Sequence, residues 1–402
     1  MSLLSRRSAV VVFLAFAFAY FFSALLRAVT ATLSPTLTQE FALNARDLGL
    51  LGGGFFLGFA ATQLPLGTWL DRYGPKHVIL GFLLLAVAGC LAFSFAGTFS
   101  GLLAARVLCG VGVSACLMAP LTGFRRWLTP AAQLRANSWM LMTGSFGMLA
   151  STLPVQWLMP VLGWRPLFWG LAALVALSMV VIAWSVPAWQ SAAAGARPGS
   201  YAQVWKHPYF RRLAPLGFFG YGGMISIQTL WAGPWMVRVA GYQPLEAATG
   251  LFLINILMLC TFLAWGVVTP WLTHRGFTTD GLIAMGMPVS FVVLGLIIAA
   301  GPAAGALAWA LFCMSSTFLA LAQPSVAMVF PAGLAGRALS AYNLVVFGGV
   351  FVLQWGIGAL IDGFGALGLD EPGSFRAAMG VFLACSILSY GYFRVAKDNS
   401  PR

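Results

Sequence analysis

Apolar stretches long enough to cross a bilayer recur along the whole chain. A transmembrane helix needs about 20 mostly apolar residues, and twelve such stretches can be counted in the 402 residues. They lie near 9–37, 47–69, 78–97, 101–124, 135–159, 165–187, 212–238, 246–271, 279–300, 304–331, 337–361 and 374–394. Charged residues make up 8% of the chain, against about 25% in soluble proteins. We therefore expect an all-α membrane protein with twelve transmembrane helices.

Basic residues outnumber acidic ones, and their placement indicates membrane topology. The formal net charge is +13, but Lys and Arg occur singly or in pairs between apolar stretches, without the basic stripe typical of nucleic-acid binding. If both termini are cytoplasmic, inner segments hold sixteen of these residues and outer segments four. Because cytoplasmic loops carry an excess of Lys and Arg, we expect a multi-pass inner-membrane protein with both termini cytoplasmic and no nucleic-acid partner.

The N-terminal arginines and the six cysteines have alternative interpretations that the sequence disfavours. Arg6 and Arg7 before an apolar run mimic a secretory or twin-arginine signal, but the run continues past the length of a signal core. We therefore expect a first transmembrane helix. All six cysteines fall within apolar stretches and lack metal-ligand spacing, so we interpret them as packing residues. No metal and no cofactor are expected.

An internal repeat is visible at a spacing of about two hundred residues. Residues 69–74 align with 271–276, and residues 135–138 align with 337–340. Parallel repeats with a solute site at their interface near the membrane midplane are one architecture of secondary transporters. The predicted parts are a six-helix bundle over 1–189, a cytoplasmic linker over 190–211, and a second six-helix bundle over 212–402.

The segment after the second apolar stretch carries a family motif. Residues 67–76 read G-T-W-L-D-R-Y-G-P-K, which resembles the G-x-x-x-D-R-x-G-x-[RK] signature of the major facilitator superfamily. Residues 106–112 resemble the R-x-x-x-G-x-G element of that family. The resemblance implies two pseudo-symmetric six-helix halves and transport by alternating access. The residues that it places in gating or conformational roles are Gly67, Asp71, Arg72, Gly74, Lys76 and Arg106.

The chemistry of the first motif suits a gate between two conformations. Gly67 permits close helix approach, and Gly74 permits a tight turn with positive φ. Asp71 can pair with Arg125 or Arg126. Ion pairs that form in one state and break in another support rocking between conformations. The alternative is a loop that only sets topology.

Two arginines lie inside the apolar stretches. Arg27 sits about two-thirds along the first stretch, where facing lipid costs about 3 kcal/mol or more. We expect it to face a central cavity, where its planar fork suits a carboxylate or phosphate; the alternative is a side chain that snorkels to the interface. For Arg106, transport and a structural hydrogen bond to backbone carbonyls of the first helix remain equal alternatives.

The region around Arg27 also resembles the organophosphate and organic-anion members of the superfamily. Phosphate-ester members have a second arginine at the matching place in the seventh helix, where this sequence has Gln228. The resemblance therefore implies a monocarboxylate or larger anion as the solute. Further candidates for the cavity are the polar or aromatic residues Tyr20, Tyr221, Gln228, Trp231, Asn255 and Gln323. Each has the alternative role of packing or helix-to-helix hydrogen bonding.

The acidic residues and histidines all map to loops or helix ends. Proton-coupled carriers commonly place such groups inside the spans, so we expect proton transfer, if any, to use the solute or a tyrosine.

The predicted function is secondary transport of a small organic anion, with H⁺ or a counter-anion, by a monomer surrounded by lipid. Alternatives are an efflux carrier for drugs or metabolites, although residues 144–151 lack the family's antiporter pattern, and a receptor or enzyme. An enzyme is disfavoured because the spans hold no paired acids or histidines.

The bias in basic residues generates a test of topology. A reporter active only in the cytoplasm, fused after Arg402, is expected to be active, because sixteen of twenty loop cations lie on that side. A periplasmic reporter at the same point serves as the control and is expected to be silent. Activity of the periplasmic reporter alone would contradict the orientation.

Overall fold

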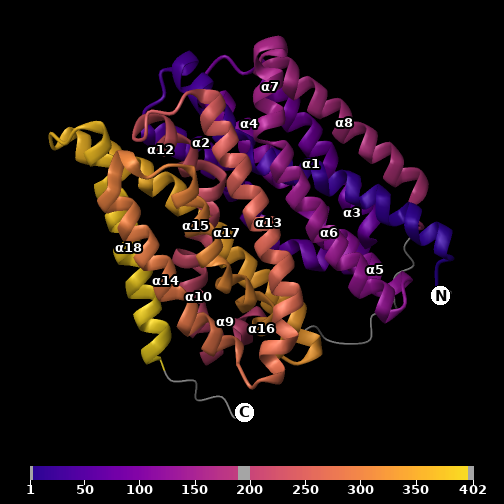
Figure 1. The fold of residues 1–402 in the computed structure, drawn as a ribbon. Coiled ribbons are helices and arrows are strands. Elements are labelled where there is room, and N and C mark those ends of the chain that lie inside the picture. Colours follow the sequence, from indigo (N-terminus) through magenta and orange to yellow (C-terminus); the bar gives the residue numbers. More distant parts are fainter. Residues whose placement is uncertain (1–2, 189–199, 397–402) are drawn as a thin grey trace. The chain divides into compact units, whose positions relative to one another are not determined.

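The computed structural model describes residues 3–188 and 200–396. Within these ranges the chain is helical and contains no strand (Figure 1). The elements are α1 (Arg6–Phe41), α2 (Ala45–Ala61), α3 (Gln63–Phe95), α4 (Phe99–Val113), α5 (Ala115–Trp127), α6 (Pro130–Ala150), α7 (Leu153–Leu162), α8 (Trp164–Ser185), α9 (Tyr201–Lys206), α10 (Pro208–Leu216), η1 (Gly217–Tyr221), α11 (Gly222–Ser226), η2 (Ile227–Trp231), α12 (Ala232–Arg238), α13 (Pro244–His274), α14 (Thr279–Ala300), η3 (Gly301–Ala303), α15 (Ala306–Ser316), η4 (Thr317–Leu321), α16 (Ala322–Val329), α17 (Ala332–Ala366) and α18 (Glu371–Val395).

Most of the expected spans are continuous helices. In the described ranges nine helices or helix runs are long and apolar enough to cross a membrane, and α6 with α7 forms a tenth, bent by 43°. The two remaining expected spans correspond to α2, which has only 17 residues, and to the run from α10 to α12. That run is divided into short pieces by η1 and η2, two π-helical segments of five residues each.

The expected loop between the second and third spans is a kink within α3. The stretch from Gln63 to Phe95 consists of two helices that meet at Gly74, which leaves the helical conformation with φ 76° and ψ 164°. Such a φ is accessible to glycine at little steric cost. The second span therefore comprises α2 and the first turns of α3, and the third span begins at Pro75.

Contacts divide the chain into two compact units. The first comprises Met1–Val29 and Gly54–Ala196, and the second comprises Thr30–Gly53 and Arg197–Arg402. The end of α1 and the beginning of α2 thus pack with the second unit, while the rest of both helices packs with the first. Each of these helices is shared between the two units.

The boundaries of the expected bundles and linker stay predictions. Of the expected linker at 190–211, residues 190–199 lie outside the described residues. The described remainder forms the short helix α9 and the beginning of α10.

In the first unit α3 packs against α4 and α8 (Figure 1). A Cβ atom on Gly110 of α4 would collide with the carbonyl of Phe55 in α2. A Cβ on Gly112 would collide with the backbone of Ala86 in α3. Because small residues let membrane helices approach closely, α4 lies backbone against backbone with both neighbours. The glycines of the second family element are thus packing residues.

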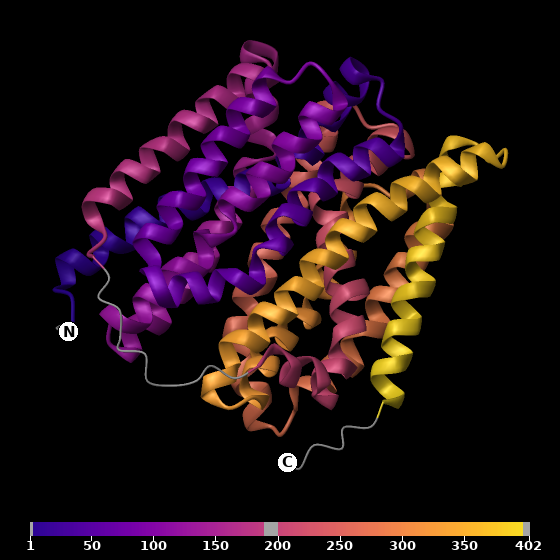
Figure 2. The ribbon, with the colours of Figure 1, turned by 180° about the vertical axis from the view of Figure 1, so that it is seen from behind.

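In the second unit aromatic residues fill the core. The indole of Trp235 donates to the Ala304 carbonyl at 3.0 Å, and its ring lies 5.3 Å from that of Trp309. Phe375 of α18 packs on Trp235 at 6.3 Å. α17 and α18 run side by side as the orange and yellow helices of Figure 2. Edge-to-face contacts of this kind stabilise a core beyond simple burial.

The close contact of α4 generates a stability prediction. Gly110→Ala is expected to lower the free energy of unfolding by about 1–3 kcal/mol, because the added carbon meets backbone that cannot move aside. Gly81→Ala is the matched control, since nothing lies within 4 Å of a Cβ at that position. Thermal unfolding of the purified variants in detergent measures both. Equal melting temperatures for the two variants would contradict the packing argument.

Candidate functional site

Arg27 and Tyr20 form a positively charged pair on α1. They are seven residues apart, which places them on one face of a helix. The guanidinium interacts electrostatically with the Tyr20 phenol, and its central carbon lies 5.4 Å from the ring centroid of Phe59 on α2. Tyr20 is buried, and its ring lies where a side chain on Gly144 of α6 would collide. The first unit therefore contains a cation and a hydroxyl that can bind an anion together.

Arg106 is buried beside this pair. Its Nη1 donates to the Leu26 carbonyl at 2.9 Å, and its guanidinium carbon lies 4.9 Å from the Phe55 ring centroid. Nε and Nη2 have no hydrogen-bond partner in the described part of the chain. The contact with Leu26 is the structural hydrogen bond that was one of the two alternatives for this residue. It ties α4 to α1 one residue before Arg27.

Three of the candidates in the second unit lie in the π-helical segments. Tyr221 ends η1, and Gln228 and Trp231 belong to η2. Single π-helical turns occur frequently at functional sites. Here they widen the seventh span and change which residues share a face. Helical periodicity assumes 3.6 residues per turn, so it could not predict these orientations.

The polar candidates in the second unit bind to one another or to backbone. Gln228 Nε2 donates to Asn255 Oδ1 at 3.0 Å, and the Asn255 amide donates to the Leu251 carbonyl at 2.9 Å. Trp231 is fully buried and donates to the Gln354 carbonyl at 3.1 Å. The structure thus joins Gln228 with Asn255 as a neutral amide pair.

Two polar residues of α17 take part in these contacts and were missed by the sequence analysis. Gln354 Nε2 donates to Thr229 Oγ1 at 2.9 Å, and Asn343 Oδ1 accepts from Gln323 Nε2 at 2.7 Å. Both belong to the apolar eleventh span, so the test for polar groups inside a span could have found them. Gln323 pairs with Asn343, and Gln228 pairs with Asn255, so these four residues form two separate pairs.

The gating motif lies at the kink of α3. Asp71 and Arg72 are exposed, and Gly74 is buried. The Arg72 guanidinium lies 5.2 Å from the ring centroid of Tyr73. Within the described residues the Asp71 carboxylate makes no ion pair, so the expected pairing with Arg125 or Arg126 is not made in this conformation. Gly67 and Lys76 are half-buried.

An ion pair joins three helices of the second unit. Its arginine entered the sequence analysis only as one of the basic residues that set the membrane topology. Arg212 Nη1 lies 2.8 Å from Asp280 Oδ2, and the Tyr209 hydroxyl donates to Asp280 Oδ1 at 2.9 Å. Arg212 Nε also donates to the Phe393 carbonyl at 2.8 Å. Asp280 lies in the first turn of α14, where the helix dipole favours an acid. We interpret this cluster as structural.

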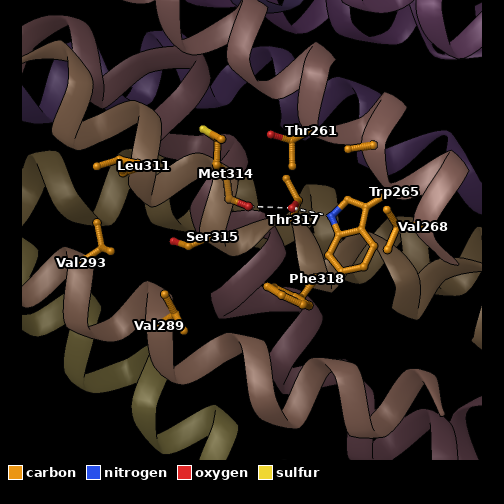
Figure 3. Close-up of a pocket in the computed structure, with 11 residues that line it drawn as sticks. Thr261, Trp265, Val268, Val289, Val293, Leu311, Met314, Ser315, Thr317 and Phe318 are labelled. Carbon is orange, nitrogen blue, oxygen red and sulfur yellow. Dashed lines mark hydrogen bonds between the residues drawn. The ribbon is translucent and has the colours of Figure 1, made fainter. Parts of the chain in front are cut away.

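A cavity of about 520 Å³ in the second unit is separate from these residues (Figure 3). It is lined by residues of α13, α14, α15 and η4, and its lining is almost entirely apolar. Its polar side chains are satisfied locally, as when Trp265 donates to Thr317 Oγ1 at 2.8 Å. None of the predicted site residues lines it. It therefore lacks the groups that an anion site requires.

The chain matches known transporters in sequence and in fold. The family model described as Major Facilitator Superfamily matches residues 16–354. The inner membrane transport protein YajR of Escherichia coli is 27% identical over 388 residues, covering 90% of this chain and 81% of YajR. The 3-(3-hydroxy-phenyl)propionate transporter of the same organism is 25% identical over 375 residues, covering 87% of each chain.

Solved structures support the same fold. A D-xylose-proton symporter superposes with a TM-score of 0.78 at 13% identity, over 96% of this chain and 97% of its own. A bacterial homolog of the human lysosomal transporter Spinster gives 0.73 at 18% identity, over 98% and 97%. The expected all-α fold with two six-helix halves is confirmed. This chain belongs to the Major Facilitator Superfamily and is a multi-pass membrane transporter, not an enzyme.

Proposed function

We propose that this protein carries a small organic anion, a carboxylate in class, across the inner membrane by alternating access. The observation that carries the proposal is Arg27, a permanent cation in the middle of a membrane span, next to the Tyr20 phenol. An ionisable side chain at this depth is expensive and marks a solute pathway by default. The guanidinium can bind a carboxylate with two parallel hydrogen bonds.

Relatives with named solutes support this class of solute. They include a probable sulfoacetate transporter of Cupriavidus necator, 25% identical over 56% of each chain. A 4-hydroxybenzoate transporter of Acinetobacter baylyi is 25% identical over 37% of this chain. With the phenylpropionate carrier, each name describes an organic acid. These solutes combine a negative charge with a small organic body.

The charge of the candidate residues favours a singly charged solute. In the first unit Arg27 supplies one positive charge beside the Tyr20 phenol. A mostly apolar lining with few polar groups is usual for small-molecule sites. An aromatic or short aliphatic monocarboxylate fits this composition better than a phosphate ester.

The membrane potential constrains the coupling. Moving one negative charge inward against 100 mV costs about 2.3 kcal/mol, so an importer needs an internal counter-anion or a co-transported cation. In the described ranges, Asp, Glu and His residues lie in loops, near helix ends or near the kink of α3, which leaves the acid group of the solute, Tyr20 or Tyr221 to carry a proton. Export of an anion needs no such partner. Both termini lie in the cytoplasm in this proposal, and the protein works as a monomer in contact with lipid.

The role of Arg27 generates a prediction about binding. Arg27→Ala is expected to abolish uptake of labelled 4-hydroxybenzoate or 3-(3-hydroxyphenyl)propionate into proteoliposomes, and Arg27→Lys to reduce it about tenfold, because a point charge replaces a bidentate fork. Arg275→Lys is the control, since that arginine stacks on Trp271 at 4.0 Å at the end of α13. Normal anion uptake by Arg27→Ala, or uptake of a neutral sugar instead, would show the anion hypothesis to be wrong.

The same proteoliposomes distinguish the modes of coupling. A pH gradient, a membrane potential and an internal counter-anion are imposed separately, with the solute outside. Stimulation by acid outside indicates proton symport, and stimulation by internal anion indicates exchange. Efflux driven by potential alone supports the export alternative. Stimulation by none of these conditions in either direction would contradict secondary transport of these acids.

The exposed Asp71 generates a prediction about gating. Asp71→Asn is expected to leave the melting temperature unchanged, because the carboxylate is exposed and makes no ion pair within the described residues. It is expected to slow transport about tenfold, because an ion pair needed in the alternate conformation is lost. Asp71→Glu keeps the charge and is expected to restore most of the rate. If Asp71→Asn transports at the rate of the parent protein, the gating role is rejected and the motif serves only to set the topology.

A further inference from the structure

The beginning of α2 is held by a carboxylate from another helix. Asp362, near the end of α17, accepts hydrogen bonds at Oδ1 from the Ala45 amide at 3.1 Å and at Oδ2 from the Arg46 amide at 2.8 Å. Asn44 Oδ1 accepts from the Asp47 amide at 2.7 Å. The first amides of a helix lack partners within the helix and carry partial positive charge. A carboxylate from α17 therefore satisfies two of them and is stabilised by the helix dipole.

Below this contact α2 and α17 meet backbone to backbone. A Cβ on Gly49 of α2 would collide with the Gln354 carbonyl, and a Cβ on Gly358 of α17 would collide with the Ala45 carbonyl. At Gly358 the nearest atoms are all backbone atoms, whereas at Gly49 the Trp231 ring also lies 3.2 Å from the Cβ position. The contact at Gly358 can separate without repacking, because no side chain lies between the two backbones at that point.

The two ends of the second span differ in their contacts. Its beginning, within Thr30–Gly53, packs with the second unit, whereas α2 from Gly54 onward packs with the first. At the other end Asp71 is exposed and makes no ion pair in the described ranges. Under the expected orientation Asp362 lies on the outer side of the membrane and Asp71 on the inner side. A carboxylate thus holds one end of the span, and at the other end Asp71 makes no ion pair within the described residues.

We propose that Asp362 and the amino end of α2 form an outer latch, which closes the outer side of the solute path and releases when that side opens. The proposal rests on the alternating-access transport proposed above, and it assigns to Asp362 a positioning role for which no sequence motif was found. Ala45, Arg46, Gly49 and Gly358 form the surface that the carboxylate holds together. The hydrogen bonds hold the latch, and the glycines allow it to part.

The latch is tested by measuring how fast a cysteine placed at its centre reacts with an external reagent. Ala45 is buried, so a thiol in Ala45→Cys is expected to react slowly with a membrane-impermeant maleimide added outside. Adding Asp362→Asn is expected to raise the labelling rate about tenfold, which corresponds to about 1.4 kcal/mol in the ratio of closed to open states. The parent chain gives the background, since its six cysteines all lie within membrane helices.

Matched controls separate the latch from a general loss of charge. Glu371 also lies near the outer end of the second unit but is exposed and pairs with Arg238 at 3.0 Å, so Glu371→Gln is expected to leave labelling unchanged. Gly358→Ala forces the helices apart without changing charge and is expected to raise labelling. Gly363→Ala, five residues along α17 with nothing within 4 Å, is expected to have no effect.

The outcomes are distinguishable from failure of the transport proposal, because labelling requires no solute. Unchanged labelling with both Asp362→Asn and Gly358→Ala would overturn the latch. An increase with Gly358→Ala alone would reject the role of the carboxylate. An equal increase at the buried native Cys313 would indicate general unfolding and would also contradict the proposal. If Asp362→Asn does not fold, the comparison of Gly358→Ala with Gly363→Ala decides whether this contact closes the outer side.

Discussion

In hydrocarbon every polar group must find its partner within the protein, and the arrangement of this chain depends on that requirement. Helices satisfy the backbone, and almost all charged side chains lie at helix ends where water can reach them. Arg27 and Arg106 are the exceptions inside the spans of the first unit. Arg106 donates a hydrogen bond to the Leu26 carbonyl. Arg27 interacts with Tyr20 and lies near the Phe59 ring. The two arginines therefore differ in their contacts although they look alike in sequence.

The same requirement explains how polar residues are distributed in the second unit. Gln228, Asn255, Thr229 and Gln354 form hydrogen bonds between helices that would otherwise be lost to lipid. These groups are neutral and can exchange partners at little electrostatic cost. A solute that brings its own donors and acceptors can take part in such a network.

Movement needs contacts that can break, and here these are made of glycine and hydrogen bonds. Gly358 brings two backbones together with no side chain among its nearest neighbours, and Asp362 adds a charge-assisted hydrogen bond that water can replace. Large aromatic residues such as Trp235 and Trp309 fill the core of the second unit instead. The division between tightly packed and separable contacts matches what the proposed alternating access requires.

The sequence by itself determined the twelve spans, the family motif, the kink residue Gly74 and the isolated charge of Arg27. These follow from local composition and from the solvent, since a bilayer accepts only long apolar helices and rejects unpaired charge. Only the tertiary structure decided that Arg106 binds the backbone of α1, that π-helical segments reorient Tyr221, Gln228 and Trp231, and that Asp362 holds the beginning of α2. Those features depend on which helices touch and in what register. Residues far apart in the chain set that register through packing, so the hydropathy of the sequence does not predict it.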